Sequence, residues 1–228
     1  MKSFSIRRAA KLLDAGQDKR ILVVGDIMLD QFVWGRVSRI SPEAPVPVVE
    51  VTRESFHLGG AGNVAHNLRR LGAVPHLVGV HGGDDAGRRL VDVVQKTGLS
   101  GGHLVRDGSR PTTLKTRTIA HSQQVVRTDR ESKTDIPEPV EDALLSEGSQ
   151  ALESAAALIL SDYSKGTLTD RVLSRSIARA RRRRIPILVD PKLKRFPAYR
   201  NVTVVTPNVT EAQEVAGIVI ESTEDLER

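Results

Sequence analysis

The sequence contains no cysteine and few aromatic residues, and each shortage excludes a class of protein. Without cysteine, a disulfide framework and a thiolate metal site are both impossible, and a reducing cytoplasm is the simplest location. Aromatic residues make up only 3% of the chain, which argues against a stacking platform for single-stranded nucleic acid. No apolar run approaches the roughly 20 residues that a membrane helix needs. We therefore expect neither a membrane nor a nucleic acid as a partner.

The residues that are present suit a globular protein with a positive surface. The chain has 228 residues, of which 39% are hydrophobic, and this is enough to bury a substantial core. Its net charge of +6 fits an anionic small-molecule substrate. Much of the excess lies in "ARARRRR" (178–184), which closes a predicted helix where cations are favourable. We interpret this run as a solvated helix end, and a nucleic-acid surface on Arg181 to Arg184 stays open as the alternative.

Short apolar runs alternate with helical patterns along the chain. Buried strands are predicted at 21–26, 75–80, 156–162, 185–190 and 202–208. Helices are predicted at 63–71, 86–96, 138–153, 169–183 and 209–216. A further amphipathic helix at the N-terminus is expected to pack on the domain. This alternation predicts an α/β fold, with a doubly wound, mostly parallel sheet and helices on both of its faces.

Two segments break the alternation. Residues 44–56 and 112–129 alternate apolar and polar side chains without a helix between strands, which predicts antiparallel strands with one solvated face. We expect them to form a small β-sheet lid. Because bare sheet edges invite aggregation, such a lid should cover a ligand or pair with another subunit.

The stretch "HLGGAGNVAHNLRRLGA" (57–73) places three glycines within four residues, ahead of a helical pattern. Gly60 to Ala65 fits the G-x-G-x-x-A fingerprint of a dinucleotide-binding turn, which would indicate a NAD-type oxidoreductase. That fingerprint needs a hydrophobic strand before the glycines, and the preceding "TRESFHL" is polar and predicted to form a strand poorly. A simple tight turn accounts for one or two glycines. Because bare backbone beside the amide of Asn63 suits hydroxyl groups, we favour a sugar-like ligand.

Polar side chains gather where the predicted strands end. Parallel strands present their carboxyl ends at one edge of a sheet, and ligands of such folds bind there. Carboxylates can accept hydrogen bonds from sugar hydroxyls, a lysine can bind phosphate, and a helix N-terminus can hold phosphate and hydrated Mg²⁺. Each residue also has a simpler explanation as a turn, a surface charge or a capping box. The residues are Asp26, Asp30, Asp162, Lys165, Asp190, Asn208 and Glu211.

Taken in order, several segments resemble the ribokinase-like carbohydrate kinases, and among them the kinases for D-glycero-β-D-manno-heptose 7-phosphate, which are often fused to an adenylyltransferase. The resemblance extends from about Ile21 to the end of the chain. Its most specific segment is "SRISPEAPVPVVEV" (38–51). The other matching segments are "VVGDIMLDQFVWGRV", "GGAGNVAHNLRRLGA", "RPTTLKTR", "SQQVVRTD", "LSDYSKG", "VDPK" and "TPNVTEA". The family fold is a doubly wound α/β domain with a β-sheet lid.

The resemblance implies a kinase that uses ATP and Mg²⁺ on a small sugar phosphate and forms a homodimer through the lid. It implies a sugar pocket lined by Asp26, Asp30, Gly59, Gly60 and Asn63. Candidates for binding the phosphate that the sugar already carries are Lys115, Arg117 and Lys165. Asp162, Lys165, Asp190 and Lys192 are expected near the phosphates. The nucleotide motif N-x-x-E corresponds to Asn208, Val209, Thr210 and Glu211, with Glu211 contacting Mg²⁺ through water.

The same resemblance implies that the catalytic aspartate lies beyond Arg228. In the family a later G-A-G-D motif supplies the aspartate that accepts the substrate's proton, and "GGDDAG" (82–87) is no substitute because it falls in an early loop. The final "ESTEDLER" predicts the opening of a helix, with Ser222 or Thr223 as its N-cap. We therefore expect residues 1–228 to be the N-terminal part of one kinase domain, without the catalytic base and without turnover on their own.

Overall fold

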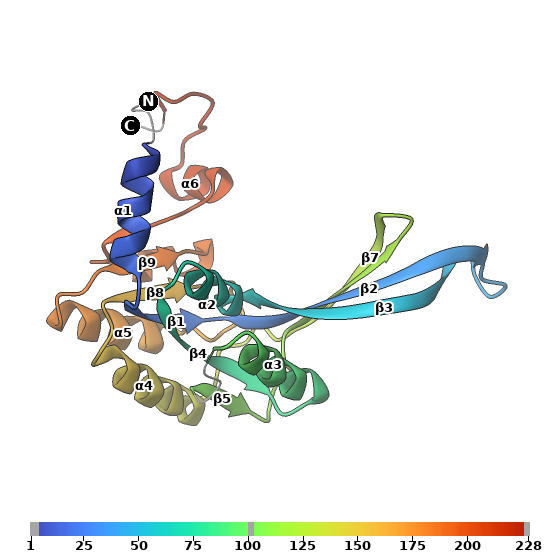
Figure 1. The fold of residues 1–228 in the computed structure, drawn as a ribbon, viewed down its shortest axis with the longest axis horizontal. Helices are drawn as coiled ribbons and strands as arrows, with labels where there is room; N and C mark the ends of the chain where they lie inside the picture. Colours follow the sequence, from blue (N-terminus) through green and yellow to red (C-terminus); the bar gives the residue numbers. More distant parts are fainter. Residues whose placement is uncertain (1–4, 100–102, 226–228) are drawn as a thin grey trace.

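The computed structural model describes residues 5–99 and 103–225, which form two β-sheets with helices around the larger one (Figure 1). The larger sheet has six strands in the order β10-β9-β8-β1-β4-β5, and all neighbours are parallel. The strands are β1 (Arg20–Gly25), β4 (Val74–Gly82), β5 (Leu104–Asp107), β8 (Ala157–Ser161), β9 (Ile187–Asp190) and β10 (Val204–Val205). The predicted parallel sheet is confirmed, and β5 is an addition that the sequence pattern did not reveal.

Helices cover both faces of this sheet. One face carries α2 (Ala61–Arg70) and α3 (Asp85–Lys96), and the other carries α4 (Glu138–Leu152) and α5 (Asp170–Arg182). Alternate residues of a strand point to opposite faces. Leu22 and Val24 of β1 therefore enter the core beneath α4 and α5, whereas Val23 enters the core beneath α2 and α3. The doubly wound arrangement is confirmed.

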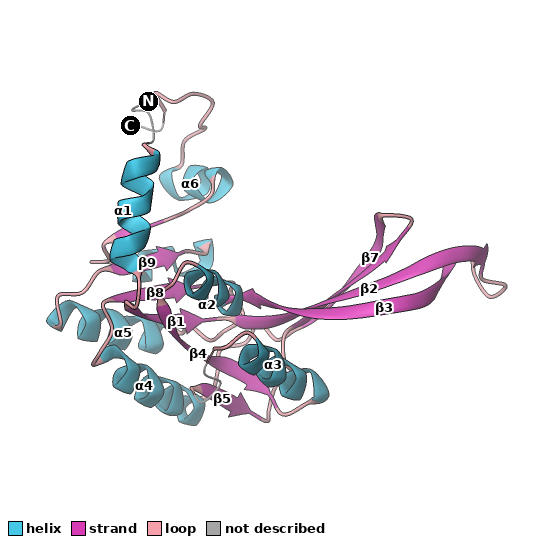
Figure 2. Ribbon diagram, viewed as in Figure 1, coloured by secondary structure: helices cyan, strands magenta, loops and turns pink. Residues whose placement is uncertain are grey.

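The lid is a four-stranded sheet that projects from the body of the protein (Figure 2). Its strands, in spatial order, are β3 (Pro47–Gly60), β2 (Ile27–Ile40), β6 (Leu114–Ala120) and β7 (Gln123–Arg130). The two predicted segments do form lid strands, as β3 and as the β6–β7 hairpin. Two details differ from the prediction: β2 is an additional strand, and it pairs with β6 in parallel instead of antiparallel fashion.

The strand β2 escaped prediction because it begins only one residue after β1 ends, without a loop between them. β1 ends at Gly25 and β2 begins at Ile27, so Asp26 alone connects strands of two different sheets. Gly25 leaves no room for a side chain, since a Cβ there would lie 2.1 Å from the carbonyl oxygen of Ser161. The glycine thus allows the backbone to pass close to β8 as the chain leaves the main sheet for the lid.

Two expectations near the chain ends are wrong. The helix α1 (Ile6–Gly16) forms as predicted but does not pack on the domain: none of its residues is buried, and Leu12 is 61% exposed. It contacts the body at its end, where the Gln17 side chain donates to the Leu71 carbonyl at 3.1 Å. The predicted buried strand at 202–208 is reduced to β10, two exposed residues, because β9 is its one neighbour among the strands of the described residues.

The remaining C-terminal elements are short. A 3-10 helix, η1 (Leu193–Ala198), follows β9, and α6 (Val209–Ala216) follows β10. Residues 222–225 form a turn or bend, and the rest of the predicted terminal helix lies outside the described residues. Within the described ranges, no helix is both long enough and apolar enough to cross a bilayer.

Candidate functional site

The strand order places the predicted site at a switch point of the main sheet. From β1 the chain adds β4 and β5 on one side, and then β8, β9 and β10 on the other. Ligands of open α/β sheets bind beyond the carboxyl ends of the strands where the order reverses in this way. Asp26 follows β1, Asp162 follows β8, and Asp190 ends β9. Register pairs Gly25 with Ser161 and Ser161 with Asp190, so the three acidic positions lie side by side on one edge.

Asp26 holds the loop that follows β8. Only 1% of its surface is exposed. Its Oδ2 accepts hydrogen bonds from the backbone N–H groups of Tyr163 at 2.7 Å and Lys165 at 3.0 Å, and its Oδ1 accepts one from Thr167 at 3.1 Å. A carboxylate has roughly four acceptor sites, so the protein already uses most of them. These are the contacts of a positioning residue, and a contact between Asp26 and a sugar stays a prediction.

Asp162 is enclosed beside Asp26. Its Oδ2 accepts a hydrogen bond from the Tyr199 hydroxyl at 2.6 Å, and its Oδ1 accepts one from the N–H of Ser164 at 2.6 Å. Burial raises the pKa of Asp162; the Tyr199 hydrogen bond opposes this effect, and the charge of Asp26 adds to it. Asp162 therefore braces the same loop from within, and its contact with a ligand also stays a prediction.

The glycine segment forms a tight junction between β3 and α2. β3 runs to Gly60 and α2 begins at Ala61, so a strand does precede the glycines. We expected the polar segment "TRESFHL" to form a strand poorly, and this expectation is wrong because pairing with β2 extends β3 through it. Gly60 has a φ of +55°, and a Cβ on it would lie 2.3 Å from the Asp26 carbonyl oxygen. Because β3 is an antiparallel lid strand, the junction differs from the parallel strand–helix turn of dinucleotide sites.

Asp30 lies next to this junction, on one face of the lid. A Cβ on Gly59 would lie 2.5 Å from a carboxylate oxygen of Asp30. The Nη1 of Arg117 donates to Asp30 at 2.5 Å, and the Arg117 guanidinium lies over the Phe32 ring, 5.2 Å from its centroid. Asn63 is exposed in the first turn of α2, and its side chain has no hydrogen bond to any described residue. The amide of Asn63 is thus available to a ligand.

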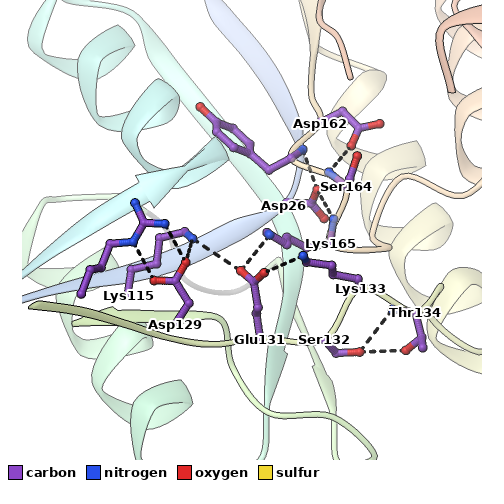
Figure 3. A network of polar contacts seen from close by, with 12 residues as sticks. Asp26, Lys115, Asp129, Glu131, Ser132, Lys133, Thr134, Asp162, Ser164 and Lys165 are labelled. Atoms are coloured by element: carbon purple, nitrogen blue, oxygen red, sulfur yellow. Dashed lines mark hydrogen bonds and ion pairs between the residues drawn. The ribbon is translucent and has the colours of Figure 1, made fainter. Parts of the chain in front are cut away.

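Three lysines converge on Glu131 beside the lid (Figure 3). The carboxylate of Glu131 lies 2.7 Å from the Nζ of Lys165, 3.4 Å from that of Lys115 and 3.6 Å from that of Lys133. Lys115 also contacts Asp129 at 2.8 Å. Burial raises the pKa of Glu131, but Lys165 and Lys115 outweigh it and hold the pKa below its ordinary value. Because Lys165 follows β8 and Lys115 belongs to β6, the network joins the lid to the main sheet.

Glu131 is a site residue that the sequence analysis missed. The predicted lid segment ended at residue 129, and β7 ends one residue later, at Arg130. Asp129 pairs with Lys115 across the lid, and Glu131 lies two residues later, where a strand would again present the same face. Extending the alternation by two residues would have found it. The side chains of Lys115, Lys165 and Glu131 are only 13–15% exposed.

The residues expected to hold the nucleotide cluster at the start of α6. Lys192 forms an ion pair with Oε1 of Glu211, and Oε2 of Glu211 accepts a hydrogen bond from the N–H of Asn208 at 3.0 Å. The Oδ1 of Asn208 accepts one from the N–H of Glu211 at 2.9 Å. The capping box that we considered as the simpler explanation is therefore present. Val209 and Thr210 are exposed in the first turn of the helix.

Asp190 and Glu211 are the two carboxylates of this cluster that could hold a hydrated divalent cation. Burial raises the pKa of Asp190. Burial also acts to raise the pKa of Glu211, but the hydrogen bonds from Lys192 and from the N–H of Asn208, together with the charge of Lys192, outweigh it, so the pKa of Glu211 falls. No group of three or more metal-ligating side chains occurs in the described parts of the chain. Mg²⁺ commonly keeps several waters and uses one or two carboxylates together with phosphates. Glu211 and Asp190 fit such a contact through water.

The arginine run lies at the opposite edge of the sheet from this cluster. α5 ends at Arg182, and the run precedes the amino end of β9. Arg183 donates to the Glu153 carboxylate at 2.9 Å and to the Glu153 carbonyl at 2.5 Å. The predicted helix end is confirmed.

Comparison with known proteins agrees with this geometry. The model for the "pfkB family carbohydrate kinase" matches residues 18–228. The chain is 46% identical to the bifunctional protein HldE of Geobacter sulfurreducens, over 90% of this chain and 42% of the relative. It is 44% identical to the HldE of Campylobacter curvus, over 90% of this chain and 44% of the relative. The chain therefore spans less than half the length of these two relatives.

Solved structures show the same fold. The tetrameric inhibited form of phosphofructokinase-2 from Escherichia coli aligns with a TM-score of 0.69 at 18% identity, covering 92% of this chain and 67% of that one. Arabidopsis thaliana ribokinase complexed with ribose and ATP aligns with a TM-score of 0.65 at 14% identity, covering 92% and 66%. Since the family model spans nearly the whole chain and the fold matches, this protein belongs to the pfkB family of carbohydrate kinases.

Proposed function

We propose that this chain forms the sugar-binding part of a kinase for D-glycero-β-D-manno-heptose 7-phosphate. In the reaction a bond forms between the C1 hydroxyl oxygen and the γ-phosphorus of ATP, the bond from that phosphorus to ADP breaks, and the hydroxyl proton passes to a base. The product is the 1,7-bisphosphate, a precursor for ADP-heptose and the lipopolysaccharide core. The segment "SRISPEAPVPVVEV", which resembles heptose kinases in particular, supports this choice of sugar.

The observation that carries the proposal is the group of cations beside the switch point. Lys115, Arg117 and Lys165 come from the lid and from the loop after β8, and each contacts a carboxylate of the protein. A substrate that already carries a phosphate needs such cations, since lysine offers a point charge and arginine a planar fork. A phosphate would take the place of Glu131 as the partner of Lys115 and Lys165.

The sugar itself would be held next to these cations. Asp30 and the exposed amide of Asn63 are placed to bond hydroxyl groups, and Gly59 and Gly60 leave the backbone between them bare. In this proposal Asp26 acts through the backbone of the loop that carries Lys165. Orientation of this kind is the main contribution a protein makes to phosphoryl transfer.

On the nucleotide side, Mg²⁺ with ATP would neutralise the charge on the transferring phosphoryl group. Glu211 would hold the ion through water, with Asp190 beside it. Lys192 would exchange its contact with Glu211 for a phosphate oxygen. The N–H groups of Val209 and Thr210, in the first turn of α6, offer further donors to phosphate.

The proposal assigns the general base to a segment outside residues 1–228, as the family resemblance implies. A base of this kind contributes about 10²–10⁴-fold to the rate. We expect the 228-residue chain to show no ATP-dependent phosphorylation of the heptose 7-phosphate in a coupled ADP-release assay. Measurable turnover by this chain would place the base among the residues present.

The substrate assignment is tested in a longer form of the protein that carries the expected base. The double variant Lys115→Gln/Lys165→Gln should raise the KM for heptose 7-phosphate about tenfold or more, with the KM for ATP nearly unchanged. Lys133→Gln is the matched control, because Lys133 is 72% exposed and lies farther from Glu131. Equal losses with the phosphorylated and unphosphorylated sugars would show that these cations do not bind the substrate's phosphate.

We also propose that the lid pairs with a second copy of the chain. Val51 and Val126 of the lid are 55% and 48% exposed, and sheets with bare apolar surface usually acquire a partner. Val126→Asp should shift the protein from dimer to monomer in analytical ultracentrifugation. Val204→Asp is the matched control on β10, where the valine is 42% exposed. A wild-type protein that is monomeric at all concentrations would contradict this part.

A further inference from the structure

A cavity of 230 Å³ lies between α4 and α5. Leu22 and Leu152, both 2% exposed, belong to its lining and give it an apolar side. Leu22 belongs to the amino-terminal half of β1, whereas Asp26 follows the carboxyl end of that strand. The cavity therefore opens on the face covered by α4 and α5, away from the edge that carries the candidate kinase site.

Four arginines of α5 line this cavity, at positions 171, 175, 179 and 182. Residues three and four apart lie on the same face of a helix, and like charges at this spacing destabilise it. The helix dipole favours cations only near the last turn. It therefore accounts for Arg179 and Arg182 but not for Arg171 and Arg175. Arg171 and Arg175 therefore add like charge to this face that the dipole does not offset.

Acidic residues in and directly after α4 account for part of the charge. Arg171 pairs with Glu141 at 3.0 Å and with Asp142 at 2.6 Å, and Arg179 pairs with Glu153, the residue after α4, at 2.7 Å. Across the described residues, Arg175 and Arg182 form no ion pair and no side-chain hydrogen bond. Two exposed positive side chains without a protein partner among the described residues thus stand at the rim of a hollow that also has an apolar surface.

Gly148 keeps the α4 wall of the hollow open. It lies inside α4, where glycine weakens a helix. A Cβ at this position would meet no atom within 4 Å, so the packing of the helix does not require glycine. The absent side chain leaves space facing the arginines of α5.

We propose that this hollow, the α4–α5 arginine cavity, binds a small phosphorylated organic anion. Arg175 and Arg182 would bind the phosphate oxygens through paired N–H groups, and the carbon skeleton would lie against Leu22 and Leu152. Binding here is separate from the proposed kinase reaction. It would stabilise the folded chain by an amount that grows with the logarithm of the ligand concentration once this exceeds the Kd.

Calorimetric titration with inorganic pyrophosphate tests the phosphate part of the cavity. The titrations use Lys115→Gln/Lys165→Gln protein, so that these two lysines of the candidate kinase site do not contribute. We expect this protein to bind pyrophosphate, and further replacement by Arg175→Gln/Arg182→Gln to weaken binding about tenfold or more. The matched control, Arg181→Gln/Arg184→Gln, removes two charges that are exposed like Arg175 and Arg182 but do not line the cavity, and it should change the affinity little.

A second variant, at Gly148, tests whether the open volume of the cavity is needed, separately from the charge of the arginines. Gly148→Leu should block pyrophosphate binding while the circular dichroism and thermal midpoint show a folded protein. Affinity that is unchanged in the Arg175/Arg182 variant, or reduced equally in the control, would overturn the proposal. A titration with a DNA duplex could also overturn it. If the duplex binds more tightly than pyrophosphate, and if both the Arg175/Arg182 and the Arg181/Arg184 variants weaken that binding equally, the arginines form an extended nucleic-acid surface.

Discussion

The Nζ of Lys165 lies 2.7 Å from the carboxylate of Glu131, and this pair joins the loop after β8 to the end of β7. The backbone N–H of the same lysine donates to Asp26 at 3.0 Å. Lys165 is thus fixed twice, through its main chain by the main sheet and through its side chain by the lid. A cation proposed to bind phosphate is therefore positioned by both sheets.

Replacing Glu131 by glutamine should destabilise the protein at neutral pH and less so in acid. Lys115 and Lys165 would lose a largely enclosed counter-charge, for which we expect a cost of about 1–2 kcal/mol. The pKa of Glu131 is held below its ordinary value of 4.5. Its ionised form therefore stabilises the fold above pH 4.5, and this contribution is lost as the pH falls through the lowered pKa of the folded state.

Urea unfolding of wild type and Glu131→Gln, from neutral pH to about pH 3.5, measures this difference. The gap between the two unfolding free energies should shrink with acid. Lys133→Gln serves as the control for a distant, exposed partner and should match wild type throughout. A gap that stays constant or widens in acid would show that the charge of Glu131 does not stabilise the network.

Asp26→Asn should lower the free energy of unfolding by about 2–4 kcal/mol. An asparagine keeps only one acceptor oxygen. Its NH₂ group would face backbone N–H groups that donate to the Asp26 carboxylate in the wild type, those of Tyr163, Lys165 or Thr167. Asp30→Asn is the informative companion, because the Asp30 carboxylate is bound by Arg117 instead of the loop backbone. It should cost less stability while weakening sugar binding and leaving nucleotide binding nearly intact.

Both variants are compared by urea denaturation and by isothermal titration with the sugar phosphate. If Asp26→Asn unfolds like wild type, the loop is not held by this carboxylate. If Asp30→Asn binds the sugar phosphate with unchanged affinity, Asp30 does not belong to the sugar site.

The sequence predicted the main sheet well because its signals are local. Buried parallel strands read as short apolar runs, and the residues that end them, such as Asp26 and Asp190, must share an edge once the strands are parallel. The lid was harder to predict. The passage from β1 to β2 takes the single residue Asp26, too short for a recognisable loop, and the alternation that would reach Glu131 ends at the strand boundary.

The direction of the enclosed carboxylates could not be predicted at all. The partner of Asp162 is Tyr199, whose hydroxyl reaches it from 37 residues away. Likewise, Asp26 faces the backbone of a loop more than 130 residues later. Strand periodicity places such residues at an edge, but tertiary packing decides whether they face a ligand or the protein.

Gly60→Ala should destabilise the protein by about 3 kcal/mol or more. The backbone of Gly60, with φ +55° and ψ −135°, lies in a region that is almost exclusive to glycine. The added Cβ would also lie 2.3 Å from the Asp26 carbonyl oxygen. Gly108→Ala is the control, since a Cβ there meets nothing within 4 Å. Thermal and urea unfolding should separate the two variants clearly; similar midpoints would mean that the junction between β3 and α2 tolerates a side chain.

Tyr199→Phe should destabilise the protein by about 1–3 kcal/mol at neutral pH and less in acid. Burial raises the pKa of Asp162, and the Tyr199 hydroxyl opposes that rise by donating to the ionised carboxylate. Without the hydroxyl the folded-state pKa of Asp162 rises further. The ionised group then opposes folding at neutral pH, and this penalty is relieved as the pH falls and Asp162 takes up its proton within the fold.

Unfolding free energies measured across pH for Tyr199→Phe and Tyr163→Phe test this coupling. Tyr163 is the matched control because its hydroxyl makes no hydrogen bond to the described residues, although burial raises its pKa as well. A loss in Tyr199→Phe that is independent of pH would indicate that the ring, and not its hydroxyl, supports Asp162. A loss that fades in acid would show that the Tyr199 hydroxyl lowers the pKa of Asp162, the buried carboxylate beside Asp26 that braces the loop carrying Lys165.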